Sequence, residues 1–138
     1  MSADKAFIDT SAILRLLLKD DEVKSKAVLR LIRDSGKNNV SLYLPPVTIM
    51  EIVWVLEKVY KTERSEIFEI VNAILNTPEL KCETEDVFRE AIIIYRDKKI
   101  KFADAVMGCW GLDKGIHVVY TYDEKDFRKI SGLDVRKP

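Results

Sequence analysis

Short β-like runs alternate along this chain with longer segments whose apolar residues have helical spacing, and this alternation most constrains the fold. Strands are predicted at residues 6–9, 40–44, 80–82, 117–121 and 133–136. Helices are predicted after residue 9 and at about 20–33, 48–60, 62–75, 84–97, 102–114 and 123–127. Strands that alternate with helices build an open, mostly parallel sheet. The sequence therefore predicts an α/β protein.

The chain is of a size that suits one domain, residues 1–138, with a substantial core. It contains no repeat, low-complexity segment or linker. Its hydrophobic fraction of 47% and its charged fraction of 33%, which is above the usual value of about 25%, indicate a soluble globular protein with a highly charged surface. No apolar run approaches the roughly 20 residues of a membrane span, and the N-terminal MSADKAFIDT lacks the apolar region of a signal peptide. We expect a cytoplasmic protein without membrane contact.

Four acidic residues lie where a predicted strand gives way to a helix, or near the start of a helix: Asp9, Glu51, Asp104 and Asp123. In an open parallel sheet the carboxyl ends of the strands face one crevice, where ligands bind. Several carboxylates in one crevice repel each other unless a cation lies among them. This pattern predicts a divalent-metal site and favours an enzyme that acts on phosphate groups.

The composition restricts the metal to ions that prefer oxygen ligands. The chain has one histidine, His117, and two cysteines, Cys82 and Cys109, that match no metal-ligand spacing. Cys109 lies in an apolar helical stretch, where we expect a buried structural residue. Zinc held by nitrogen and sulfur is therefore nearly excluded, and magnesium, calcium or manganese remain.

Most of these carboxylates also have a purely structural interpretation. Asp9 could cap the first helix. Glu51 stands three residues after Thr48, which is the spacing of a capping box. Asp123 and Asp126 could stabilise the first turn of the short helix near residue 125. Asp104 is hardest to explain in this way, because apolar residues flank it and no basic residue follows at the i+4 position.

Four segments taken together resemble a known family. FIDTSAILRLLL, the isolated Glu51 after a Pro-Pro strand end, KFADAVMGCWGLDKG and TYDEKDFRKISGL are similar in order and spacing to a PIN-domain ribonuclease, in particular to the VapC-type toxins of toxin–antitoxin pairs. The similarity spans essentially the whole chain. It implies a three-layer α/β/α fold with a mostly parallel sheet of about five strands.

The resemblance also implies roles for individual residues. Asp9, Glu51, Asp104 and Asp123 would be the catalytic, metal-binding acids, and Thr121 would help to orient the site. Ser11 stands where many members have asparagine, so a contact made by that amide is in doubt here. Asp126 is an additional or substitute acid that ranks below Asp123.

The activity implied by the resemblance is hydrolysis of RNA with Mg²⁺ or Mn²⁺, leaving a 5′-phosphate and a 3′-hydroxyl. Arg15 and Lys101 are the residues we expect to contact RNA phosphates. A homodimer and a small inhibitory antitoxin are the implied partners. Trp54, Tyr60 and Phe68 could supply the surfaces that such partners need, or they could belong to the core, and periodicity does not separate the two.

The sequence also bears on other functions. The net charge of zero counts against simple electrostatic binding of nucleic acid, although an acidic pocket with a basic rim would also cancel in the total. A phosphatase of the haloacid dehalogenase type needs an aspartate where this chain has Ser11. A PIN-fold component of RNA processing, or a non-catalytic RNA-binding protein, is the principal alternative.

Overall fold

The computed structural model describes residues 4–138, which form two compact units. The first unit takes the chain up to Tyr60 and adds Ala73–Glu83, and the second consists of Lys61–Asn72 and Thr84–Pro138. Each unit is described by itself below. The assignment of residues 1–138 to one domain stays a prediction.

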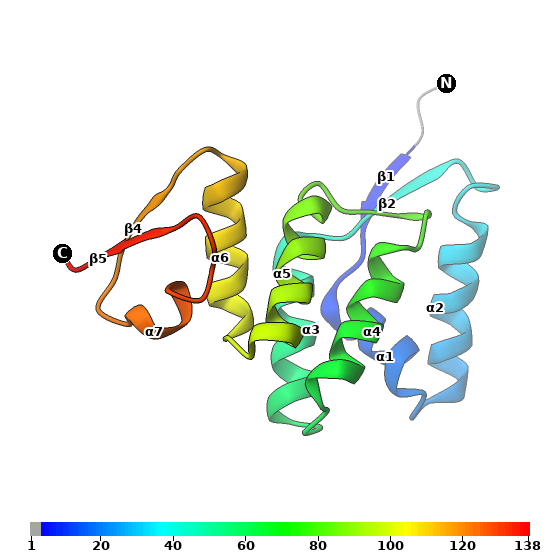
Figure 1. Cartoon of the computed structure of the whole chain (residues 1–138). Coiled ribbons are helices and arrows are strands. Elements are labelled where there is room, and N and C mark those ends of the chain that lie inside the picture. The colour runs from blue at the N-terminus through cyan, green and yellow to red at the C-terminus, as the bar shows by residue number, and fades with distance from the viewer. Residues whose placement is uncertain (1–3) are drawn as a thin grey trace. The chain divides into compact units, whose positions relative to one another are not determined.

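The first unit contains a parallel sheet of three strands. β1 (Asp4–Phe7), β2 (Val40–Tyr43) and β3 (Leu80–Lys81) pair in the order β1-β2-β3. Asp4 is aligned with Val40 and Leu42 with Leu80. β1 and β2 run side by side in Figure 1.

Three helices of the first unit connect these strands. α1 spans Thr10–Leu18, α2 spans Glu22–Asp34 and α3 spans Pro46–Lys58. Asp9 and Asp21 cap α1 and α2 by accepting hydrogen bonds from backbone N–H groups of the first turn. α3 instead begins with a proline at its first helical position, where the missing N–H group is not needed.

The helix after β1 is less buried than its composition predicts. α1 is rich in leucine, and the sequence suggested that most of its surface would be buried. In the structure only Ile13 of this helix is fully buried, and the other apolar side chains are partly exposed. The expected burial of this helix is therefore only partial, although α1 packs against both α2 and α3.

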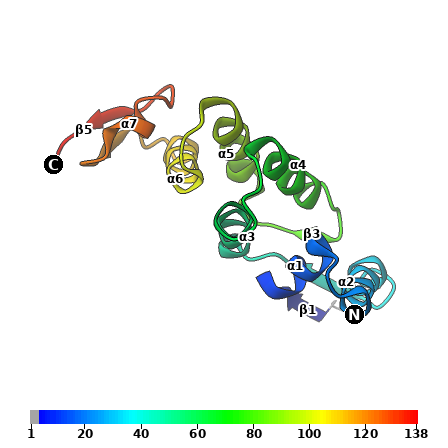
Figure 2. The same ribbon diagram turned by 90° about the horizontal axis from the view of Figure 1, so that it is seen from below.

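The second unit contains most of α4 (Arg64–Leu75), then α5 (Glu85–Lys98), α6 (Phe102–Asp113) and the short α7 (Glu124–Phe127). α5 packs along α6, and Figure 2 shows the two helices side by side. The strands β4 (Val118–Tyr120) and β5 (Asp134–Arg136) form a parallel pair. Gly115 ends α6 with a φ of 74°, the left-handed conformation that its position after the helix predicts.

Aromatic residues form much of the core of the second unit. The Phe88 and Phe102 rings are stacked with centroids 6.2 Å apart, and Tyr95 meets the Phe102 ring edge-on at 5.7 Å. All three are buried. This cluster joins α5 to the first turn of α6, which is the turn that carries Asp104.

The predicted α/β class is confirmed, and every predicted strand and helix is present within a few residues of its expected bounds. All recorded strand pairs among residues 4–138 are parallel, and the five strands form one ladder of three and one of two. None of the helices in these residues is both long enough and apolar enough to cross a membrane.

The three aromatic residues of uncertain role fall into two groups. Trp54 and Tyr60 have 58% and 49% of their surface exposed, so they do not belong to the core of the described chain. Phe68 is partly covered, because the Arg96 guanidinium lies 3.9 Å from the centre of its ring. Cys109 is buried as expected, and this burial raises the pKa of its thiol to about 11.

Candidate carboxylate site

Asp9 follows the first strand and caps α1. Its Oδ1 accepts hydrogen bonds from the Ser11 hydroxyl at 2.8 Å and from the Ala12 N–H at 3.2 Å. The residue is exposed, and no hydrogen bond to its Oδ2 is recorded within residues 4–138. The structural interpretation of Asp9 as a cap is therefore correct, and it leaves one carboxylate oxygen available for another ligand.

Glu51 lies on α3, and the capping-box interpretation of this residue is wrong. The helix begins at Pro46 with Pro45 as its N-cap, so Thr48 is already inside the first turn. The Thr48 N–H donates to the Pro45 carbonyl at 2.9 Å, and the residue is buried. Glu51 is exposed, and neither a side-chain hydrogen bond nor an ion pair is recorded for it in the described chain. No local structural role accounts for its charge.

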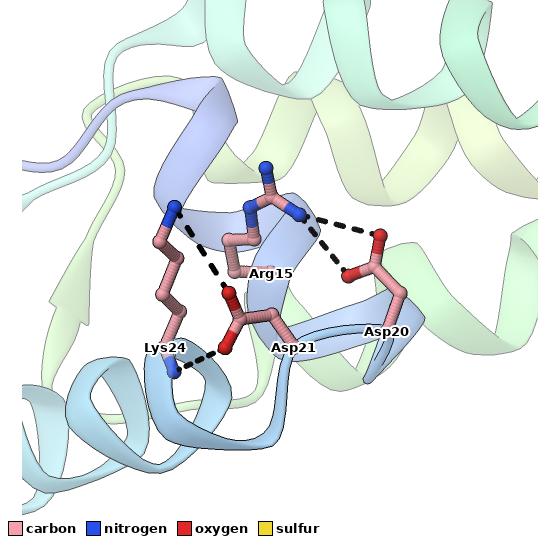
Figure 3. Close-up of polar contacts among 4 residues, drawn as sticks. All are labelled: Arg15, Asp20, Asp21 and Lys24. Carbon is pink, nitrogen blue, oxygen red and sulfur yellow. Dashed lines mark hydrogen bonds and ion pairs between the residues drawn. The ribbon is translucent and has the colours of Figure 1, made fainter.

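Arg15 does not present a free charge. Its Nη1 lies 3.3 Å from both carboxylate oxygens of Asp20, while Asp21 accepts from the Lys24 N–H and approaches its ammonium group (Figure 3). The Arg15–Asp20 pair is substantially exposed, so it contributes little to stability. A phosphate contact by Arg15 would require it to exchange one anion for another.

In the second unit, Asp104 lies in the first turn of α6 and is half-buried. Burial raises the pKa of its carboxyl group, and a hydrogen bond with the Asp126 side chain and the nearby charges of Asp126 and Asp123 raise it further, while Lys101 opposes them. The positive end of the helix dipole also favours an acid at this position. Asp104 is thus the member of a carboxyl pair whose pKa is raised.

Asp126 is the member of that pair whose pKa is lowered. It is buried, and its Oδ2 accepts a hydrogen bond of 2.9 Å from the Lys101 backbone N–H. This hydrogen bond is the main cause that lowers the pKa of Asp126, and the bond with Asp104 and the charges of Lys129 and Lys101 act in the same direction against burial. Two carboxyl groups that share one proton titrate as a pair.

Asp123 and Thr121 lie in the turn that follows β4. The Thr121 Oγ1 accepts a hydrogen bond from the Asp123 N–H at 2.9 Å, which holds the turn. The Asp123 carboxylate is exposed and lies 3.7 Å from the Lys101 ammonium group. Thr121 therefore orients Asp123 through the backbone, and Lys101 balances its charge.

The structure thus brings several predicted residues together. In the second unit Asp104 contacts Asp126, and Asp123 contacts Lys101. In the first unit Asp9 is bonded to Ser11, and no contact between Asp9 and Glu51 is recorded. Among residues 4–138, no group of three or more histidine, cysteine, aspartate or glutamate side chains forms a ready-made metal site. The assignment of the four acids as metal ligands stays a prediction.

The chemistry of these groups fits a hard divalent cation. The donors are carboxylate oxygens, which magnesium and manganese prefer. The nearby charge of Asp126 helps to raise the pKa of Asp104, and a cation would relieve that repulsion.

One residue of this region was missed by sequence reasoning. Arg64 lies 31 and 36 positions before the two backbone carbonyls that it binds, those of Tyr95 in the last turn of α5 and of Ile100 just before α6. A lone arginine at the start of a helix carries no signal of such a distant contact.

Parallel strands joined by helices, with carboxylates after the strands and at a helix start, define an α/β protein with an acidic site. Comparison with known proteins identifies the family within this class. The chain matches the PIN domain family over residues 6–133 and therefore belongs to that family. It is also 29% identical over 123 residues to a VapC ribonuclease of Aquifex aeolicus (strain VF5), which covers 89% of this chain and 90% of the relative. The family resemblance inferred from the sequence is confirmed.

Proposed function

We propose that this protein is a divalent-metal-dependent endoribonuclease and the toxin of a type II toxin–antitoxin pair. The observation that carries the proposal is the similarity to a VapC ribonuclease along almost the full length of both chains. Membership of the PIN domain family supports the same activity. The paired carboxyl groups of Asp104 and Asp126 support the use of a metal.

In this proposal the catalytic, metal-binding acids are Asp9, Glu51, Asp104 and Asp123, the ion is Mg²⁺ or Mn²⁺, and Asp126 supports Asp104. A bound ion would make water a better nucleophile and would neutralise charge on the phosphoryl oxygens. Attack on phosphorus breaks the bond to the 3′ oxygen, and the products are a 5′-phosphate and a 3′-hydroxyl.

The side chains around Asp104 have separate tasks. A bound cation would favour the charged form of the Asp104 carboxyl group, whose pKa is raised. The Lys101 N–H donates to Asp126 and favours its charged form. The exposed Lys101 ammonium group, which pairs with Asp123, would contact a phosphate of the RNA. Arg15 is the weaker of the two expected RNA contacts, because Asp20 already binds it.

The partners follow from the same assignment. We expect a homodimer and a small antitoxin protein, both in the cytoplasm. The exposed side chains of Trp54 and Tyr60 provide apolar area that such a protein partner would cover.

The proposal is tested by incubating the purified protein with a mixed set of structured RNAs in magnesium, in manganese and in EDTA. The wild type is compared with Asp104→Asn and with Asp113→Asn, a control at the exposed end of the same helix. Wild type and Asp113→Asn should cleave with either metal and not in EDTA, whereas Asp104→Asn should be inactive.

Other results would separate the alternatives. Equal cleavage by wild type and Asp104→Asn would point to a contaminating nuclease. RNA binding without cleavage in either metal would favour a non-catalytic RNA-binding protein. An RNA-processing enzyme would cleave but would have no adjacent gene for a small protein with a DNA-binding N-terminus.

A further inference from the structure

Arg64, the first residue of α4, is bound to two distant backbone carbonyls. Its Nη1 donates to the Tyr95 oxygen at 2.9 Å and to the Ile100 oxygen at 2.7 Å. Its guanidinium carbon also lies 4.3 Å from the centre of the Tyr95 ring. One side chain thus makes two charge-assisted hydrogen bonds and a cation–π contact, which fix it far better than a solvated arginine.

The peptide group between Ile100 and Lys101 is held on both sides. Its carbonyl oxygen accepts the bond from Arg64, and its N–H donates to the Asp126 Oδ2 at 2.9 Å. A peptide group is planar, and in the trans form its C=O and N–H point in opposite directions. Fixing the carbonyl oxygen therefore fixes the direction of the N–H toward Asp126.

The arginine charge also acts on the strength of this second bond. A cation that binds a carbonyl polarises the peptide, and neighbouring hydrogen bonds strengthen one another. The Lys101 N–H donates to the Asp126 Oδ2, and the Asp126 side chain in turn bonds Asp104. Arg64 thus acts on both carboxyl groups through one peptide.

A purely structural role would be to cap the end of α5. This role accounts for the bond to Tyr95, which belongs to the last turn of that helix. It does not account for the bond to Ile100, which lies beyond the end of the helix at Lys98. Lys99 adopts a φ of 55°, an uncommon conformation for a residue other than glycine. The segment between α5 and α6 therefore needs contacts, such as the Arg64–Ile100 bond, that hold it in place.

We propose that Arg64 is a positioning residue for the carboxyl pair Asp126 and Asp104, and that it acts by holding the Ile100–Lys101 peptide in place. This inference rests on the proposed ribonuclease function, to which it adds a residue that touches neither metal nor RNA.

The first test measures hydrogen exchange of the Lys101 amide in the full-length, metal-free protein. Arg64→Ala should speed exchange at Lys101 about tenfold, with much smaller changes at the buried core positions Ala91 and Ile92. Arg96→Ala is the matched control, since Arg96 also stacks on an aromatic ring in this unit but its recorded partners are Asp97 and Phe68. It should leave Lys101 exchange unchanged.

The second test measures RNA cleavage by the same variants. Arg64→Ala should lower kcat roughly 10- to 100-fold, because small displacements of reacting groups are costly, and should leave KM unchanged. Arg64→Lys keeps the charge and can donate to Ile100, so it should restore part of both kcat and Lys101 exchange protection. Arg64→Lys also serves if Arg64→Ala does not fold.

The outcomes distinguish this inference from the proposed function. The role of Arg64 would be overturned if Arg64→Ala left Lys101 exchange or kcat unchanged. It would also be overturned if Arg96→Ala lost as much exchange protection and kcat as Arg64→Ala. Neither result would affect cleavage by the wild type. If Arg64→Ala does not fold, the test rests on Arg64→Lys. The role of Arg64 would be overturned if Arg64→Lys exchanged its Lys101 amide fast and still had the kcat of the wild type. A wild type that cleaves no RNA in either metal would overturn the proposed function and, with it, the catalytic meaning of this contact.

Discussion

At the scale of single residues, Asp9 combines two roles that substitution can separate. Its side chain caps α1, and the proposal also makes it a metal ligand. Asparagine caps a helix about as well as aspartate, but it is a poorer ligand for a hard cation. Loss of the charge should therefore weaken metal binding and keep the helix cap, whereas loss of the side-chain oxygen should remove both.

Asp9→Asn should abolish cleavage and leave the stability of the protein unchanged or slightly higher. Asp9→Ala should also be inactive, and it should lose about 0.5–2 kcal/mol of unfolding free energy with the cap. Urea denaturation of the three proteins, measured without metal, checks the difference. Equal destabilisation by both substitutions would show that the charge itself serves the fold.

The raised pKa of Asp104 predicts how the stability of the protein depends on pH. Its pKa is raised in the folded protein, so ionisation of Asp104 costs stability. The associated stability is present below the pKa of the unfolded chain, near 3.9, and is lost as pH rises through the folded pKa. Asp126 has a lowered pKa and the opposite dependence, because its stabilisation is lost as pH falls through its folded pKa.

Replacement of Asp104 by asparagine removes the pH dependence of stability that comes from Asp104. The asparagine amide can still donate a hydrogen bond to Asp126. Without metal, Asp104→Asn should therefore be more stable than the wild type at pH 7, by on the order of 1 kcal/mol, and should have no advantage at pH 3.5. Denaturation at the two pH values checks this. An advantage that grows as pH falls would contradict the assignment of the proton to Asp104.

At the scale of the elements, the end of α6 depends on one glycine. Gly115 has a φ of 74°, and a Cβ added there would meet no atom within 4 Å. Gly115→Ala should therefore cost about 1 kcal/mol from backbone conformation alone. Gly36→Ala is the matched control, because it also faces open space but lacks a positive φ. Thermal denaturation should show a loss for Gly115→Ala alone.

At the scale of the whole molecule, metal binding should stabilise the fold. An ion that binds the native protein alone adds about 2.7 kcal/mol at 100 times its dissociation constant. We expect manganese to raise the Tm of the wild type and of Asp113→Asn, and to have little effect on Asp104→Asn or Asp9→Asn. An equal shift in all four proteins would mean that the ion binds elsewhere.

The sequence predicted the elements and the family more completely than the site. Helix and strand bounds follow from local periodicity and capping residues, which is why Asp9 was identified correctly as the cap of the first helix. The start of α3 was wrong by two residues, because Pro46 suits the first helical turn as well as it ends a strand. Sequence reasoning ranked Asp126 below Asp123, and in the structure it is Asp126 that bonds Asp104.

What the sequence determined by itself is local: the alternation of strands and helices, the parallel α/β class, and the acids that follow strands or begin helices. Only the tertiary structure decided how much of α1 is buried, which two carboxyl groups form a pair, and that Arg64 binds the peptide before α6. The physical reason is distance along the chain. Capping and periodicity act over a few residues, whereas the contacts of Arg64 and Asp126 join groups 36 and 25 positions apart, and no local pattern records them.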